Sequence, residues 1–277
     1  DNLSLGLVLE PTLWPREYGS LTFTADYWKI RQENLVGIFG GHNQLLMDYY
    51  LRQIGQTNPN LVRAAPDAQQ IADAAAAGLA PVGTLLSIKD EYVNLQPRES
   101  EGLDLRMFYS LRNTPAGSFR LSVNASQKLK LFQEASEAHQ MLLDALQDGV
   151  ISGVTVSGVE DLVRRNGRPE WKVTASLTWS KGPFTSGWYT SYVSDFYDTT
   201  ANDATTGDYW MVEEWMTHNL YVQFEFDKGP LANTRVRIGA RNLFDEDPPL
   251  TDDRFGFNGS VHSNRGRWLY ATIRKEF

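Results

Sequence analysis

Aromatic and acidic side chains gather between residues 199 and 215 of this chain. Aromatic rings stack on the C–H faces of a sugar, and carboxylates accept hydrogen bonds from its hydroxyl groups. The stretch therefore predicts a binding site for a sugar or another polyol, with Asp208, Tyr209, Trp210 and Trp215 as the contacting residues. The alternative interpretation is that the rings form a belt at a membrane surface and that the acids are solvated loop charges.

A second candidate site lies in the last long connector, residues 244–263. Arg254, Phe255 and His262 combine a cation, an apolar ring and an imidazole there, a set that would receive an anionic ligand such as a ferric chelate. A solvated loop with local packing explains the same residues equally well.

Composition excludes several other kinds of chemistry. The chain has no cysteine, which removes disulfides and thiolate catalysis, and its four histidines show no metal-ligand spacing. We therefore predict no catalytic residue, no metal site and no cofactor. A formal net charge of -8 over 277 residues argues against nucleic acid as a partner, because phosphate backbones need clustered Lys and Arg.

The elements that would position these residues are long strands. Apolar and polar residues alternate with period two, and successive side chains of a strand point to opposite faces. In the last segment Leu269, Ala271 and Ile273 share a face with the terminal Phe277. The alternating segments are residues 2–9, 20–27, 102–111, 119–131, 171–180, 213–227, 235–241 and 266–277. Residues 184–198 are predicted as a further strand, with aromatic rings on both faces.

Strand length and loop length both favour a membrane. Most of the segments exceed the roughly five or six residues typical of soluble strands. The connections alternate between compact turns and long connectors, as do the periplasmic turns and extracellular loops of an outer-membrane barrel. The turns are residues 113–117, 181–183 and 227–231, and the predicted extracellular loops are residues 33–93, 134–168, 199–212 and 244–263.

Two short helices are expected within the first long loop. Asn43 would cap a helix over residues 44–54, and Asp67 would cap another over residues 68–77. The first helix would cluster Leu45, Leu46, Tyr49 and Tyr50.

The number of strands predicts that the barrel is incomplete. An odd set of about nine strands does not close as a usual bacterial single-chain barrel, because its two edges would stay unpaired in lipid. We therefore expect that strands are missing before Asp1 and that another polypeptide supplies them.

Short motifs in four places resemble one family. They are Asn94 through Gly102-Leu103-Asp104, the segment Arg241-Asn242-Leu243-Phe244-Asp245-Glu246, the pair Gly266-Arg267 that opens the last strand, and the terminal Phe277. In these motifs the chain resembles the C-terminal part of the TonB-dependent outer-membrane receptors. The resemblance implies an all-β, transmembrane antiparallel barrel of about 22 strands around an N-terminal plug, of which this chain is about the last nine strands. It also implies that Phe277 is the signal for barrel assembly.

Charged residues on the polar side of the strands are candidates for holding the plug. Pairing among themselves is the plainer interpretation, because oppositely charged neighbours on a strand face commonly interact. The predicted plug-facing lumen residues are Asp104, Arg106, Arg235, Arg237 and Arg241.

The leading functional hypothesis is that the chain is part of a TonB-dependent receptor in the outer membrane of a Gram-negative bacterium. Such a receptor takes up a scarce nutrient, a siderophore or an oligosaccharide for example, and is not an enzyme. Its expected partners are the plug and first strands on a separate chain, TonB acting through that part, outer-membrane lipid and a surface lipoprotein. Alternatives from other classes are a soluble all-β carbohydrate-binding or glycoside-hydrolase domain and a passive porin.

Overall fold

The computed structural model describes residues 1–11 and 15–276. The chain folds as two compact units, and we describe each by itself. The sheet unit contains Asn2–Ile30, Ser100–Leu131 and Leu162–Phe277, and the loop unit contains Asp1, Arg31–Glu99 and Phe132–Asp161. Phe277, the predicted assembly signal, lies outside the described residues.

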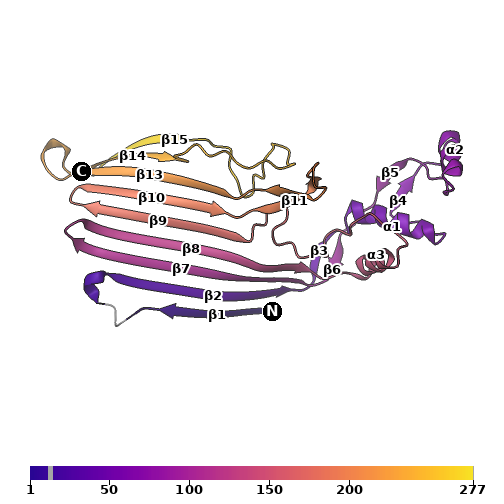
Figure 1. Cartoon of the computed structure of the whole chain (residues 1–277), viewed down its shortest axis with the longest axis horizontal. Helices are drawn as coiled ribbons and strands as arrows, with labels where there is room; N and C mark the ends of the chain where they lie inside the picture. The colour runs from indigo at the N-terminus through magenta and orange to yellow at the C-terminus, as the bar shows by residue number, and fades with distance from the viewer. Residues whose placement is uncertain (12–14, 277) are drawn as a thin grey trace. The chain divides into compact units, whose positions relative to one another are not determined.

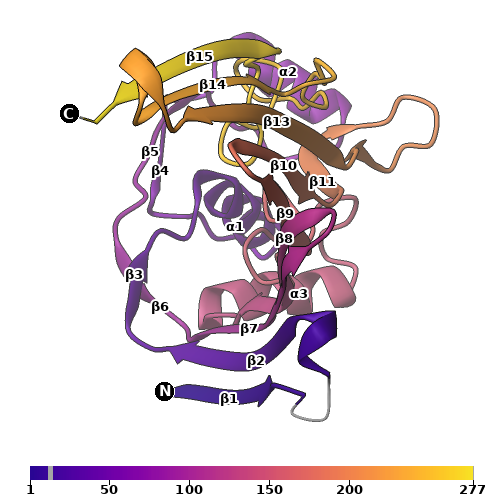
Figure 2. The ribbon, with the colours of Figure 1, turned by 90° about the vertical axis from the view of Figure 1, so that its left-hand side faces the viewer.

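A nine-stranded sheet dominates the described chain. Its strands, in spatial order, are β1 (Asn2–Leu9), β2 (Ser20–Gln32), β7 (Arg98–Thr114), β8 (Gly117–Gln133), β9 (Trp171–Lys181), β10 (Phe184–Val193), β13 (Trp215–Phe226), β14 (Thr234–Arg241) and β15 (Trp268–Lys275). The sheet is curved, with β1 and β15 at its two ends (Figure 2). The fold class is therefore all-β with few helices, as predicted, whereas closure into a barrel of about 22 strands stays a prediction.

The two faces of the sheet differ in polarity, as the alternation predicts. On one face Val222, Ile238 and Ala271 lie in register across three strands, and the exposed fraction of Ile238 is 64%. One position further along the strands, Gln223, Arg237 and Thr272 form a row on the opposite face. We call these the apolar face and the polar face. Because large apolar side chains of this face, such as Val222 and Ile238, are exposed, lipid is the medium that suits them.

Tyrosine rings cover glycines on the polar face. Gly187, Tyr221, Gly239 and Tyr270 form one row across β10, β13, β14 and β15. A Cβ atom on Gly187 would lie 2.1 Å from the Tyr221 ring, and one on Gly239 would lie 2.5 Å from the Tyr270 ring. The missing side chains thus let each ring lie flat against its neighbouring strand and fix the register there.

The connections of the sheet unit are sorted by length. In Figure 1 the short connections, including those of β7 to β8 and β9 to β10, lie at one end of the sheet. Long connectors leave from the opposite ends of the strands. Short 3-10 helices lie in the connections of β1 to β2 (η1, Arg16–Tyr18) and β13 to β14 (η2, Gly229–Leu231).

The predicted loop at residues 199–212 contains a hairpin. The strand predicted over residues 184–198 ends at Val193, and the chain then pairs with itself as β11 (Phe196–Asn202) and β12 (Tyr209–Val212), a separate two-stranded sheet. Ser194 marks the exit from the large sheet, because its side chain accepts a 3.0 Å hydrogen bond from the backbone N–H of Trp171.

The loop unit combines the two longest connectors around a small core. It contains α1 (Gly41–Gln53), α2 (Ala68–Ala76) and α3 (Glu137–Gln147), with the strand pairs β3 (Leu35–Gly37) with β6 (Val93–Leu95) and β4 (Leu61–Arg63) with β5 (Leu85–Ile88). Leu46 of α1 and Leu142 of α3 are buried in this core. None of the helices in the described ranges is long and apolar enough to cross a membrane.

The helix predictions are partly confirmed. Asp67 caps α2 and accepts a 2.8 Å hydrogen bond from the backbone N–H of Gln70, whose side chain bonds back to Asp67. Asn43 does not cap α1, because the helix begins at Gly41 and the Asn43 side chain, 1% exposed, bonds to the backbone of Ser157 in the other connector. The predicted cluster on α1 is wrong for Leu45 and Tyr49, which are exposed, and α3 was not predicted.

Candidate functional site

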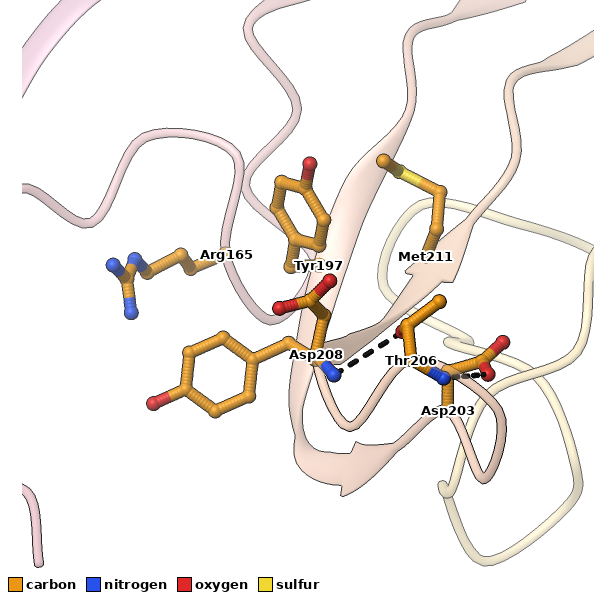
Figure 3. A pocket seen from close by; sticks show the side chains of 7 residues that line it. Arg165, Tyr197, Asp203, Thr206, Asp208 and Met211 are labelled. Atoms are coloured by element: carbon orange, nitrogen blue, oxygen red, sulfur yellow. Dashed lines mark hydrogen bonds between the residues drawn. The ribbon is translucent and has the colours of Figure 1, made fainter. Parts of the chain in front are cut away.

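A cavity of about 570 Å³ opens beside the β11–β12 hairpin (Figure 3). We call it the tyrosine pocket. Its lining residues are Arg165, Tyr197, Asp203, Thr206, Asp208, Tyr209 and Met211. The volume lies within the roughly 300–1,000 Å³ of ordinary small-molecule sites.

A tight turn carries the acidic side of the pocket. The Asp203 carboxylate accepts backbone hydrogen bonds from Thr205 at 2.7 Å and from Thr206 at 3.1 Å. These two donors hold the pKa of Asp203 below its ordinary value, so the carboxylate is ionised at neutral pH. The backbone N–H of Asp208 donates to the Thr206 hydroxyl at 3.2 Å, which leaves the Asp208 carboxylate on the pocket wall.

Two consecutive arginines hold the two tyrosines of the pocket. The Arg164 guanidinium lies 5.4 Å from the ring centre of Tyr197, and that of Arg165 lies 5.6 Å from the ring centre of Tyr209. Arg164 is also ion-paired with Asp195. Cation–π contacts of this kind fix the planes of the rings, so that both present defined surfaces to the cavity.

The segment that carries these arginines has an unusual backbone. Arg164 and Asn166, on either side of Arg165, have left-handed φ values of 60° and 46°. Backbone hydrogen bonds tie the segment to β11: Tyr197 donates to Arg164 at 2.7 Å, and Asn166 donates to the Tyr197 carbonyl at 2.8 Å. Left-handed non-glycine residues are strained and occur where the surrounding structure enforces them, often at functional sites.

The structure brings together two of the four residues predicted in this region. Asp208 and Tyr209 line the tyrosine pocket. Trp210 does not; its indole N–H donates to the carbonyl of Leu250 at 2.9 Å and fastens the hairpin to the last connector. The sequence prediction missed Arg165 and Tyr197, which also line the pocket.

Trp215 and His262 belong to a buried aromatic cluster instead. The His262 ring stacks on Phe196, with ring centres 5.7 Å apart, and meets the edge of Trp215 at 5.5 Å. His262 is 5% exposed, and neither of its ring nitrogens has a hydrogen-bond partner among the described residues. Burial, with a smaller contribution from the charge of Lys172, lowers the pKa of His262 to about 4. These two side chains pack against Phe196 and each other, and their predicted contact with a ligand stays a prediction.

Arg254 and Phe255 lie apart from the pocket lining. Phe255 is 77% exposed, with the Arg254 guanidinium 5.5 Å from its ring centre. The two residues contact each other, and their predicted role with an anionic ligand stays a prediction. Within residues 1–11 and 15–276 no group of acidic or histidine side chains is placed to hold a metal ion.

The arginines of β14 are engaged within the sheet. Arg235 pairs with Glu225 at 3.0 Å. Arg237 donates to the Gln223 side chain at 2.7 Å and lies 4.2 Å from the ring centre of Tyr221, whose ring it covers. Arg241 lies over the ring of Trp268 at 5.1 Å. These contacts stiffen the polar face, which is the plainer of the two interpretations of the charged residues.

Asp104 and Arg106 occupy a different place on the polar face. Both line a hollow of about 330 Å³ that also receives Asn124, Lys172 and Thr174. The hollow provides donors and acceptors for a polypeptide loop or a small polar group. Contact between any of these residues and a plug stays a prediction.

The family comparison decides between a soluble and a membrane sheet. Residues 1–243 match the family described as "TonB dependent receptor-like, beta-barrel". The chain belongs to this family. TonB-dependent receptors are outer-membrane transport proteins, so the outer membrane is where this chain resides, and the soluble carbohydrate-binding alternative finds no support.

Two solved receptor structures have a similar fold. The match to a variant of the ferric enterobactin receptor of Pseudomonas aeruginosa covers 98% of this chain and 30% of the receptor chain, with 12% identity and a TM-score of 0.51. The match to the siderophore receptor PirA of Acinetobacter baumannii covers 98% of this chain and 31% of the PirA chain, with 11% identity and a TM-score of 0.52. No curated protein sequence matches the chain. At such identity the likeness concerns the fold, and the chain spans about a third of those receptors.

Proposed function

We propose that the chain forms the C-terminal part of the transmembrane barrel of a receptor that takes up a scarce nutrient with energy relayed by TonB, without catalysing a reaction. The observation that supports the proposal is the amphipathic sheet of this chain, taken together with its membership of the family. Its apolar face has exposed side chains such as Leu269 (70%) and Ile273 (73%), which suit lipid, while its polar face suits a filled lumen.

The two ends of the sheet support the proposal that other strands complete the barrel. In the described part β1 pairs with β2 alone and β15 pairs with β14 alone. Unpaired backbone N–H and C=O groups in hydrocarbon cost several kcal/mol each, so both edges need partners in a membrane. We assign the partners to the plug-bearing part of the same receptor, which brings the barrel to about 22 strands.

The same arrangement assigns the sides of the membrane. The short connections would face the periplasm, and the long connectors 33–93, 134–168, 199–212 and 244–263 would face the outside, where a surface lipoprotein could meet them. The tyrosine pocket then receives the nutrient, and the hollow at Asp104 and Arg106 faces the plug.

Uptake in the native cell tests the proposal. Deletion of the receptor gene should abolish saturable uptake of its nutrient under iron or carbon limitation, and loss of TonB should have the same effect. Uptake that persists without TonB would instead indicate a passive porin. Recovery of the receptor as a soluble monomer without detergent would contradict the membrane assignment altogether.

A further inference from the structure

We infer that the tyrosine pocket binds a neutral polyhydroxylated ligand, such as a sugar ring of a short oligosaccharide. The inference rests on the proposed receptor function and names the chemical class of its nutrient. It is drawn from the charge, the hydrogen-bonding groups and the rigidity of the pocket.

The charge of the pocket favours a neutral ligand over an anion. Its lining contains one guanidinium, Arg165, and two carboxylates, Asp203 and Asp208. The neighbouring Arg164 adds little positive charge because it is ion-paired with Asp195. An anionic chelate would meet a wall of net negative charge, whereas a neutral polyol experiences no such repulsion.

The pocket offers a polyol both kinds of hydrogen bond. Figure 3 shows Arg165 on one side of the pocket and Asp203 with Thr206 on the other, with Tyr197 and Asp208 between them. Carboxylates accept hydrogen bonds, the guanidinium donates them, and tyrosine hydroxyls do both. A ring of vicinal hydroxyls alternates the same two functions, and its C–H faces fit a tyrosine ring.

The pocket is also held in shape before any ligand arrives. Asn166 accepts a 2.8 Å hydrogen bond from the backbone of Thr199 and donates one of 2.7 Å to the Thr199 hydroxyl. A Cβ atom on Gly167 would lie 2.8 Å from the Asn258 side chain, so the last connector packs directly against residues 164–167, the segment that carries the two arginines. A pre-formed site loses less conformational freedom on binding, and this compensates for the few hydrogen bonds that a small neutral ligand makes.

Binding to the complete receptor in detergent tests the inference. The probes are short neutral malto-, cello-, xylo-, manno- and galacto-oligosaccharides and, as the anion, a ferric tris-catecholate, measured by isothermal titration calorimetry. At least one neutral oligosaccharide should bind saturably, with an affinity that changes little between about 50 and about 500 mM salt because the ligand carries no charge. The ferric tris-catecholate should not bind in the pocket.

Substitutions locate the binding. Asp208→Asn and Tyr209→Ala should each weaken the binding of that oligosaccharide about tenfold or more. Asp253→Asn and Tyr92→Ala make the same chemical changes at exposed positions outside the pocket and should leave the affinity unchanged. The inference is overturned if no oligosaccharide of the panel binds, if Asp208→Asn and Tyr209→Ala have no effect, or if the ferric tris-catecholate binds and Asp208→Asn strengthens it.

Energised uptake separates this inference from the receptor proposal. Uptake of a ferric chelate that requires TonB would preserve the proposed function and refute the polyol class. Oligosaccharide binding in the pocket combined with uptake that does not need TonB would support the polyol class and refute the proposed function.

Discussion

Acidification is predicted to loosen the last long connector at His262. The imidazole is buried between Phe196 and Trp215, and its pKa is about 4 there, against 6.5 for an ordinary histidine. Because the open connector exposes the ring, the open form binds the proton more tightly than the closed form. The closed form therefore keeps its full stability above pH 6.5 and loses it as the pH falls toward about 4.

The size of the effect follows from the two pKa values. Each unit of difference corresponds to about 1.4 kcal/mol, so the whole difference destabilises the closed connector by about 3 kcal/mol. Between pH 7.5 and pH 5 the open fraction should rise about thirtyfold. The charge of Lys172 contributes in the same direction, since it also disfavours a protonated imidazole.

Single-cysteine labelling measures this opening, because the chain contains no cysteine of its own. Val212, 1% exposed, is the Cα partner of Phe196 and should react in Val212→Cys only when the cluster opens. Glu213→Cys is the exposed neighbour, and the ratio of the two labelling rates removes the intrinsic pH dependence of the thiol.

Two controls decide whether His262 is responsible. His262→Leu should abolish the pH dependence of the ratio without reducing protection at pH 7.5, because the imidazole nitrogens have no partner among the described residues. His42→Leu, at an exposed histidine of the loop unit, should leave the pH dependence intact. An equal ratio at pH 7.5 and pH 5, or the same rise in His262→Leu, would refute the reasoning.

Three further predictions concern stability. Ile238→Lys should destabilise the receptor in lipid vesicles by about 2–4 kcal/mol of unfolding free energy in urea, since it places a cation on the apolar face, whereas Ser176→Lys on the polar face should change it little. Gly187→Val should cost about 1–3 kcal/mol in the same assay by displacing the Tyr221 ring, and a Tyr221→Ala background should remove the loss. Asp67→Ala should raise hydrogen exchange in α2 by the equivalent of about 1 kcal/mol, and unchanged exchange would contradict the capping role.

The large sheet could be predicted because its signal is local. Each strand alternates between lipid and polar surroundings, so residues two apart carry the same information, as Leu269, Ala271 and Ile273 do in β15. The same local signal misplaced the end of β10. Residues 184–198 carry aromatic rings on both faces, so the pattern gives no sign that the chain leaves the sheet at Ser194, and β11, which follows, is also a strand. Periodicity identifies a strand but not the strand with which it pairs.

The loop unit was harder to predict because its determinants are non-local. Asp67 was assigned correctly, since a capping box involves residues three apart. Asn43 has the type and position of a cap, yet its amide binds the backbone of Ser157, far along the chain, and helix α1 starts before it. A cap prediction fails when a distant polar group competes for the same side chain.

The candidate site shows how the period of a strand separates neighbours of similar type. Treating residues 199–212 as a loop made Tyr209 and Trp210 equivalent candidates. In the structure these residues belong to β12, so Tyr209 and Met211 line the pocket, while Trp210, between them, reaches the carbonyl of Leu250. Another part of the wall comes from Arg165, whose contact with Tyr209 no spacing rule could reveal, because it depends on how two connectors fold against each other. The composition of residues 199–215 indicates which kinds of side chain are available, and the pairing of β11 with β12 determines which of them line the pocket.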